Sequence, residues 1–310
     1  MLEVENLSKV YKSKKAVDGV NLYLDSGESI GLLGPNGAGK STTISMMSTL
    51  IRPSDGDVRF KGKSILKQPD LVRPILGVVP QEIALYEELT AYENMKFFGR
   101  VYGLSGKKLD NKVEEVLELV GLKERKKEKI KGYSGGMKRR INIAVALMHQ
   151  PELLIMDEPT VGIDPQSRNY ILEMVRQLNQ EKGMTVLYTS HYMEEVERLC
   201  DRIYIMDHGK VIASGTKDEL KSILSGEETV LVEVQHKTNA LANQIASLPS
   251  IQKVTEVEKG FKVIAPKGEN IFTDVFRATE EAGVKLMGLH VQTPTLEDVF
   301  LHLTGRKLRD

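Results

Sequence analysis

Apolar and polar residues follow two different periods along the chain, and these periods predict its elements. Short apolar runs bounded by polar or turn residues are typical of buried strands. Segments with helical character separate most of these runs, and strands that alternate with helices predict a mainly parallel sheet covered by helices. The predicted strands are 30–33, 75–79, 153–156 and 185–189, followed by a hairpin of 203–206 and 211–214.

Two stretches of the first 222 residues depart from this alternation. At the start of the chain, spaced apolar residues predict a smaller antiparallel layer. Residues 88–131 have helical character throughout, and Thr90 and Glu93 form a T-x-x-E capping box at the start of one helix. We interpret residues 88–131 as a helical insertion in an α/β core. The apolar residues are Val4, Val10, Val20, Leu22 and Leu24 in the layer, and Val113, Val116, Leu117 and Val120 at i, i+3, i+4 and i+7 in a second helix.

The pattern changes again after the polar stretch 222–228. Half-buried strands are predicted at 230–234, 261–265 and 286–291, with helices at 240–248 and 272–282 between them. This sequence of elements predicts a small α+β domain with ferredoxin-like order. The chain is therefore expected to consist of a first domain, 1–222, and an accessory domain, 223–310.

Composition and charge narrow the possible partners. Of 310 residues 41% are hydrophobic and 28% are charged, as in an ordinary globular protein. Acidic and basic residues balance at 43 each, so no net charge recruits nucleic acid. The only cysteine, Cys200, cannot form an intrachain disulfide and predicts a reducing, cytosolic setting. No apolar run approaches the length needed to cross a bilayer, so any membrane association is expected to come through a partner.

A glycine-rich stretch after the first predicted core strand indicates phosphate binding. It reads Gly34-Pro35-Asn36-Gly37-Ala38-Gly39-Lys40-Ser41-Thr42 and fits the pattern G-x-x-x-x-G-K-[ST]. The glycines let backbone N–H groups curl around an anion, and a helix predicted over 40–51 adds its N-terminal donors. Lys40 would reach the β- and γ-phosphates of a nucleotide, and the hydroxyl of Ser41 would bind Mg²⁺.

Two further motifs carry candidate chemistry. The strand 153–156 is followed by Asp157 and Glu158, of which the first would hold Mg²⁺ and the second would polarise an attacking water. The alternative is an acidic turn without a catalytic role, which the presence of the phosphate loop in the same chain disfavours. The stretch Ser134-Gly135-Gly136-Met137 precedes a helix predicted over 138–149 and forms a second anion-binding device, although flexible loops use the same residues.

This set of motifs closely resembles the ATP-binding subunit of ABC transporters over about residues 1–222. The resemblance implies a P-loop NTPase fold, ATP and Mg²⁺ as ligands, and a head-to-tail dimer, formed by two identical or two similar ATPase subunits. The motifs stand in the family's order: Gly34–Thr42 resemble Walker A, Gln81 the Q-loop, Ser134–Met137 the signature, Leu153–Glu158 Walker B, Gly162–Asp164 the D-loop and His191 the H-loop.

The resemblance also implies roles for single residues. Ser134, Gly135 and Gly136 would act on the nucleotide of the partner subunit, so a lone protomer is expected to be nearly inactive. Gln81 would meet Mg²⁺ and water, and His191 would contact the γ-phosphate and orient Glu158. Tyr11 resembles the aromatic residue that stacks on adenine, with a core or surface tyrosine as the alternative. The remaining histidines are interpreted as structural: His149, His208, His236, His290 and His302.

Some positions depart from the family's common pattern. Tyr133 and Met137 replace the usual Leu and Gln around the signature, and Val161 and Ile163 vary the D-loop. None of these changes removes a backbone donor, so catalysis is expected to survive.

The last part of the chain indicates which branch of the family the sequence resembles. Residues 294–304 resemble the end of ATPases of the drug-resistance and lipid-exporter branch. The same residues also read as a packing helix with Leu296, Val299, Phe300 and Leu303 on one face.

Together these features predict an ATP-hydrolysing subunit that powers a separate membrane permease, an exporter of drugs, lipids or ions, at the cytoplasmic face of the cell membrane. A soluble ATPase of this class acting on ribosomes or DNA is the alternative.

Overall fold

The computed structural model describes residues 1–224, 226–268, 271–292 and 294–305. The described residues form two compact units, one ending at Thr216 and the other beginning at Lys217. The boundary expected from sequence lay after residue 222. The difference arises because helix α7 (Lys217–Ser222) packs against α10 (Leu296–Thr304) and so belongs with the second unit.

The first unit is built around a sheet with the order β10-β9-β3-β8-β7-β6. All neighbours in it are parallel except β10 and β9, which form the predicted hairpin. Every residue of β3, β7 and β8 is buried, as expected for strands covered on both faces. The strands are β3 (Ser29–Leu33), β6 (Leu76–Val79), β7 (Leu153–Met156), β8 (Thr185–Ser190), β9 (Arg202–Asp207) and β10 (Lys210–Thr216).

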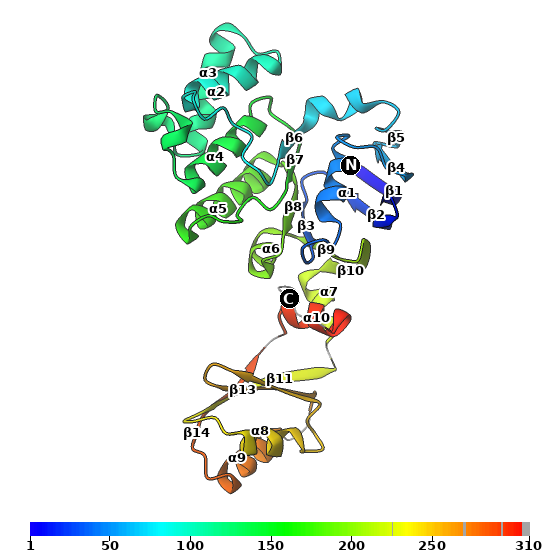
Figure 1. Cartoon of the computed structure of the whole chain (residues 1–310), viewed down its shortest axis with the longest axis vertical. Helices are drawn as coiled ribbons and strands as arrows, with labels where there is room; N and C mark the ends of the chain where they lie inside the picture. The colour runs from blue at the N-terminus through cyan, green and yellow to red at the C-terminus, as the bar shows by residue number, and fades with distance from the viewer. Residues whose placement is uncertain (225, 269–270, 293, 306–310) are drawn as a thin grey trace. The chain divides into compact units, whose positions relative to one another are not determined.

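The predicted antiparallel layer is also present, with the order β2-β1-β4-β5. Helix α1 (Lys40–Met47) packs between this layer and the parallel sheet, and all three share one core. Figure 1 shows α1 and the layer on one side of the sheet and two helices, α4 (Gly135–Ala146) and α5 (Pro165–Lys182), on the other. The strands of the layer are β1 (Leu2–Tyr11), β2 (Lys14–Leu24), β4 (Asp55–Phe60) and β5 (Lys63–Ser64).

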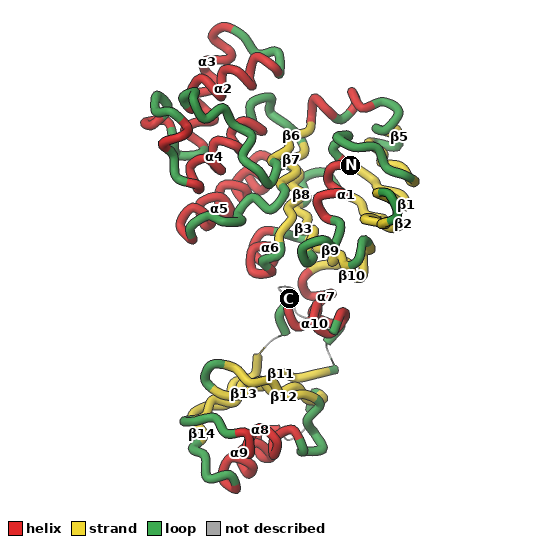
Figure 2. The backbone as a smooth tube through the Cα atoms, in the orientation of Figure 1, coloured by secondary structure: helices red, strands yellow, loops and turns green. Residues whose placement is uncertain are grey.

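The helical insertion begins at the predicted capping box. The Thr90 hydroxyl accepts a bond from the Glu93 backbone N–H at 3.1 Å, and the Glu93 carboxylate accepts one from the Thr90 N–H at 2.8 Å. The insertion contains α2 (Ala91–Val101) and α3 (Gly106–Leu119), which Figure 2 shows on the same side of the sheet as α4 and α5. The helices that follow it are α4 (Gly135–Ala146), α5 (Pro165–Lys182) and α6 (Met193–Leu199), and short 3₁₀ turns lie at 69–71, 73–75, 123–125 and 130–132.

Two predicted helices have different ends in the structure. The helix predicted over 40–51 ends at Met47, because Ser48 turns its hydroxyl back to the Ile44 carbonyl and Thr49 takes a left-handed φ of 61°. The helix predicted over 138–149 begins at Gly135, because Ser134 accepts a bond from the Met137 N–H and caps it.

The second unit has the predicted ferredoxin-like order. Its antiparallel sheet runs β12-β13-β11-β14, and α8 and α9 share a core with it. The sequence did not predict β12, because no residue of this strand is fully buried. Leu303 of α10 is 37% exposed, although sequence placed it on the packing face. The elements are β11 (Glu227–Val234), α8 (Asn239–Ala246), β12 (Lys253–Val257), β13 (Gly260–Pro266), α9 (Ile271–Glu281) and β14 (Leu286–Gln292).

The core of the first unit yields a stability prediction. Leu32 lies in β3 with no exposed surface, so Leu32→Ala is expected to lower the free energy of unfolding by about 2–5 kcal/mol through lost burial and a cavity. The control is Leu50→Ala, since Leu50 is 71% exposed and its truncation is expected to cost less than about 0.5 kcal/mol. Urea unfolding followed by circular dichroism measures both, and equal losses would contradict the assignment of the core.

Candidate nucleotide-binding site

The candidate site lies where three neighbouring parallel strands end. Strands β3, β8 and β7 stand side by side in the same direction, so their carboxyl ends meet at one edge of the sheet. Such an edge is where open α/β sheets bind ligands. The loop 34–39 leaves β3, Asp157 and Glu158 follow β7, and His191 follows β8.

The loop 34–39 needs its glycines for shape as well as for anion access. Gly37 and Gly39 have φ angles of 81° and 106°, which favour glycine. A Cβ on Gly34 would lie 2.4 Å from the carbonyl oxygen of Met206 in β9, so the loop packs directly on that strand. Gly39 caps α1, whose first N–H groups are left for a ligand.

Lys40 is the first residue of α1, directly after this loop, and is only 4% exposed. Its ammonium donates to the carbonyl oxygens of Gly34 at 2.7 Å and Pro35 at 3.1 Å. It also lies 3.1 Å from Oε1 of Glu158. A negatively charged phosphate oxygen could take the place of this carboxylate beside the buried ammonium.

Glu158 links the phosphate loop to the histidine. Its Oε2 lies 3.2 Å from Nδ1 of His191, and its backbone N–H donates to the hydroxyl of Thr189 at 2.8 Å. Glu158 is 5% exposed and has a left-handed φ of 44°, a costly backbone conformation for a residue with a side chain. Lys40, Glu158 and His191 therefore form one connected group.

Oxygen ligands for a hard cation stand next to this group. Asp157 is 9% exposed, and its Oδ1 accepts a bond from the Thr189 hydroxyl at 2.8 Å. Ser41 lies exposed at the start of α1. Among the described residues no cluster of His, Cys, Asp and Glu side chains could hold a metal alone. This donor set fits Mg²⁺, which is usually held by one or two carboxylates together with substrate phosphates.

A pocket of about 810 Å³ covers this edge. It includes the predicted Tyr11 and Gln81, together with residues that sequence analysis did not select. His208 is one of these: it was interpreted as structural, but its side chain is 79% exposed at the pocket rim. No motif marks these residues, because they come from the start of β2 and from the turn between β9 and β10. The lining is Tyr11, Lys14, Lys15, Ala16, Asn36–Thr42, Gln81, Glu158, His208 and Gly209.

The signature residues do not line this pocket. Ser134 and Gly135 are exposed, and nothing lies within 4 Å of a Cβ built on Gly135. Gly136 is different, because its added Cβ would lie 2.0 Å from Oγ of Ser167 at the start of α5. Gly136 therefore serves close helix packing, whereas Gly135 leaves an open surface.

Arg139, in the first turns of the signature helix α4, holds the Q-loop. Its guanidinium donates to the carbonyl oxygens of Pro80, at 2.8 Å, and of Gln81. Asn142, one turn further on, accepts a bond from the Ala84 N–H at 3.2 Å. Burial lowers the pKa of Arg139 from its ordinary value. The backbone around Gln81 is thus fixed to the helix that begins at Ser134.

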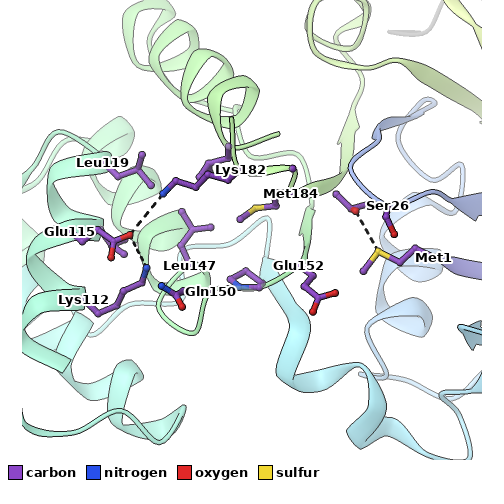
Figure 3. Close-up of a pocket in the computed structure, with 15 residues that line it drawn as sticks. Met1, Ser26, Lys112, Glu115, Leu119, Leu147, Gln150, Glu152, Lys182 and Met184 are labelled. Atoms are coloured by element: carbon purple, nitrogen blue, oxygen red, sulfur yellow. Dashed lines mark hydrogen bonds and ion pairs between the residues drawn. The ribbon is translucent and has the colours of Figure 1, made fainter. Parts of the chain in front are cut away.

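A second cavity, of about 380 Å³, lies at the opposite ends of β7 and β8. Figure 3 shows Lys112 and Lys182 both directed at Glu115, beside the apolar side chain of Leu147. Its lysines are already paired, and it holds neither the glycine loop nor a helix N-terminus. The phosphate-binding features belong to the other edge of the sheet.

Family models match both units of the chain. Residues 17–161 match the model described as "ABC transporter", and residues 215–304 match that of the C-terminal domain of DrrA1-3-like ATP-binding proteins. Among the described residues no helix has both the length and the apolar content needed to cross a membrane.

Individual proteins match over most or all of the chain. The linearmycin resistance ATP-binding protein LnrL of Bacillus subtilis (strain 168) is 53% identical, with 100% of both chains covered. The daunorubicin resistance ATP-binding protein DrrA3 of Streptomyces coeruleorubidus is 38% identical, with 98% of this chain and 96% of the relative covered. A dimeric ATP-binding cassette solved in a post-hydrolysis state with ADP and Pi is 28% identical, with a TM-score of 0.64, over 70% of this chain and 98% of that structure.

These similarities confirm the predicted P-loop NTPase fold, ATP binding and ATPase activity, and they do not favour the alternative of a ribosome- or DNA-directed ATPase. The motif order, the site at the ends of β3, β7 and β8, and the match over the full length of LnrL lead to one conclusion. The chain belongs to the ATP-binding subunits of ABC transporters, in the branch of drug-resistance exporters.

Proposed function

We propose that the pocket beside Lys40 holds ATP and that Glu158 acts as the general base that activates the attacking water. The observation that carries this proposal is the connected group of Lys40, Glu158 and His191, which joins three strand ends in a buried site. The loop N–H groups and Lys40 would hold the β- and γ-phosphates. Tyr11, on the pocket wall, would stack on the adenine.

His191 would keep Glu158 oriented. A ring nitrogen 3.2 Å from Oε2 fixes one oxygen of this carboxylate and leaves Oε1, which faces Lys40, to change partners when phosphate enters. The cation then pairs with phosphate, and the freed carboxylate oxygen can accept a proton from water. The left-handed backbone at Glu158 is consistent with a residue held in place for function.

Mg²⁺ would be held by Ser41, Asp157 and Gln81. When bound there, Mg²⁺ would neutralise charge that develops on the phosphate oxygens. Asp157 is already oriented by the Thr189 hydroxyl. Gln81 sits in a backbone held by Arg139, so a change at this position would be passed to α4 and the helical insertion.

The site would be completed by a second subunit. Ser134 and Gly135 are exposed at the N-terminus of α4 and lie outside the lining of the protomer's own pocket. An exposed helix N-terminus that lies outside the protomer's own pocket fits a phosphate presented by the partner of a head-to-tail dimer. The similarity to a cassette solved as a dimer with ADP and Pi supports this arrangement.

The partner in the membrane would be a separate permease, on whose cytoplasmic face this subunit would sit. The names of LnrL and DrrA3, resistance proteins for linearmycin and daunorubicin, support a drug-like export cargo. ATP binding would close the dimer, and hydrolysis would reopen it. The helical insertion near Gln81 would transmit this motion to the permease.

Isolation of the tagged full-length chain from detergent-solubilised membranes tests this function. We expect one integral membrane protein to copurify and the complex to release phosphate from ATP. Cells that carry the wild-type complex are expected to tolerate linearmycin better than cells that carry the Glu158→Gln variant. Copurification of ribosomes or DNA in place of a membrane protein would contradict the proposal.

A further inference from the structure

A buried carboxylate outside the nucleotide pocket joins the segments that carry Glu158 and His191. Glu195 lies in α6 and is 3% exposed. It does not line the pocket of about 810 Å³ and belongs to none of the motifs found in the sequence. Because a buried charge is costly unless it is paired and hydrogen-bonded, its partners indicate what it does.

Three hydroxyl groups converge on one oxygen of this carboxylate. Oε2 of Glu195 lies 2.7 Å from Oγ1 of Thr160, 2.9 Å from the phenol oxygen of Tyr188 and 3.0 Å from Oγ of Ser190. Oε1 lies 2.9 Å from the same Thr160 hydroxyl. An ionised carboxylate only accepts hydrogen bonds, so all three hydroxyls donate toward it.

The remaining neighbours fit an ionised carboxylate. Nε of Arg168, from α5, lies 3.3 Å from Oε1, an ion-pair contact that lacks hydrogen-bond alignment. Burial, and next the charge of Glu195, raise the pKa of Tyr188 well above its ordinary value, so the phenol keeps the proton that it donates.

The hydroxyls belong to the two segments that meet at the active centre. Thr160 is two residues beyond Glu158, and Ser190 immediately precedes His191. The Ser190 hydroxyl also accepts a bond from the Tyr192 N–H at 2.8 Å, which fixes the chain on the far side of His191. One carboxylate thus holds both segments at a fixed separation.

We infer that Glu195 is a positioning residue that sets the contact between Glu158 and His191. This inference rests on the proposed roles of these two residues. The contact is 3.2 Å long, and the left-handed backbone of Glu158 needs surrounding structure to maintain it. A displacement of a catalytic group by about 1 Å can cost on the order of 10²-fold in rate. None of the residues of this cluster lines the pocket that would hold ATP, so loss of the cluster should spare nucleotide affinity.

The experiment compares two substitutions of Glu195 in the full-length protein. Glu195→Met keeps the length of the side chain and removes the acceptor, and we expect kcat to fall roughly 10-fold or more with KM for ATP nearly unchanged. Glu195→Gln keeps one carbonyl oxygen that the three hydroxyls can share, and we expect it to retain kcat within about threefold of wild type. The control is Glu194→Gln, because Glu194 is exposed on the same helix and its change should leave kcat unaltered.

Two hydroxyl variants test the same contacts if Glu195→Met does not fold. Thr160→Val cuts the link toward Glu158, and Ser190→Ala cuts the link toward His191. Because both act through one carboxylate, the double variant is expected to lose little more kcat than the worse single variant. Multiplicative losses would overturn the inference.

Two other results would also overturn it. One is a Glu195→Met protein whose kcat stays within about twofold of wild type. The other is a parallel fall of kcat, ATP affinity and Tm, which indicates a structural role alone. If either result is found and the Glu158→Gln variant is inactive, this inference is rejected and the proposed function stands. An active Glu158→Gln variant would reject the proposed function itself.

Discussion

Glu158→Gln is expected to lower ATP turnover by about 10²-fold or more and to leave ATP bound with nearly unchanged affinity. The amide keeps the shape of the side chain at the end of β7 but cannot accept a proton from water. The phosphate loop and Lys40, which would hold the nucleotide, are not altered. Phosphate release under saturating ATP, together with a binding titration of a fluorescent ATP analogue, measures both quantities.

The same substitution is expected to change the stability of the nucleotide-free protein. Lys40 and Glu158 are buried side by side, 3.1 Å apart, and loss of one partner leaves the other charge with the carbonyl oxygens of the loop alone. The free variant should therefore melt at a lower temperature than the wild type. Added ATP supplies phosphate oxygens to Lys40, so the rise in Tm on binding should be larger in the variant.

Glu152→Gln is the matched control. Glu152 precedes the same strand at its opposite end and is exposed, so the identical chemical change there should alter neither turnover nor the effect of ATP on Tm. Near-normal hydrolysis by Glu158→Gln would remove Glu158 from the role of general base. A loss of equal size in both variants would point to a general effect of charge.

Contiguous motifs explain why so much of the site could be predicted from sequence. The phosphate loop must follow a buried strand and open a helix, and residues 29–47 have this order within one short stretch. Asp157 and Glu158 likewise follow their strand directly. In a parallel sheet the carboxyl ends of strands share an edge, which explains why Lys40, Glu158 and His191 lie together. The contact between His191 and Glu158 was expected from the family resemblance, because the strands alone do not predict their order in the sheet.

Contacts between segments distant in the sequence could not be predicted in this way. Lys15 reaches the pocket from the start of β2 and His208 from the turn between β9 and β10, and only the folded sheets place these two segments beside the loop 34–39. Glu195 looks in the sequence like any acid in a surface helix, because α6 carries Glu194 next to it. Its burial follows from the packing of α6 on β3 and β8.

Local side-chain bonds also changed the ends of helices. Ser48 and Ser134 are both serines at helix ends, yet one closes α1 with a bond to a carbonyl and the other opens α4 by accepting from an N–H. Periodicity alone does not distinguish these uses, because it reports which face is buried and not where the backbone bonds stop.

Ser134→Arg is expected to abolish the ATP-induced dimer and to lower turnover by about 10²-fold, while the protomer still binds ATP. Ser134 is exposed, so the larger side chain does not disturb the core and costs mainly the cap of α4, about 1 kcal/mol. At the proposed interface the arginine would occupy the space intended for the partner's γ-phosphate. Light scattering on the Glu158→Gln background, which should hold ATP without hydrolysis, measures the dimer directly.

Two further variants on this background separate a shared site from one completed within the protomer. Lys40→Met is expected to lose both ATP binding and the dimer, because Lys40 serves the protomer's own pocket. Ser105→Arg is the control, since Ser105 also precedes a helix and is exposed but lies outside the signature; it should lose neither. If Ser134 acted on the nucleotide of its own protomer, Ser134→Arg would behave as Lys40→Met does. A Ser134→Arg protein that remains monomeric and still hydrolyses ATP at the wild-type rate would show that no partner is needed.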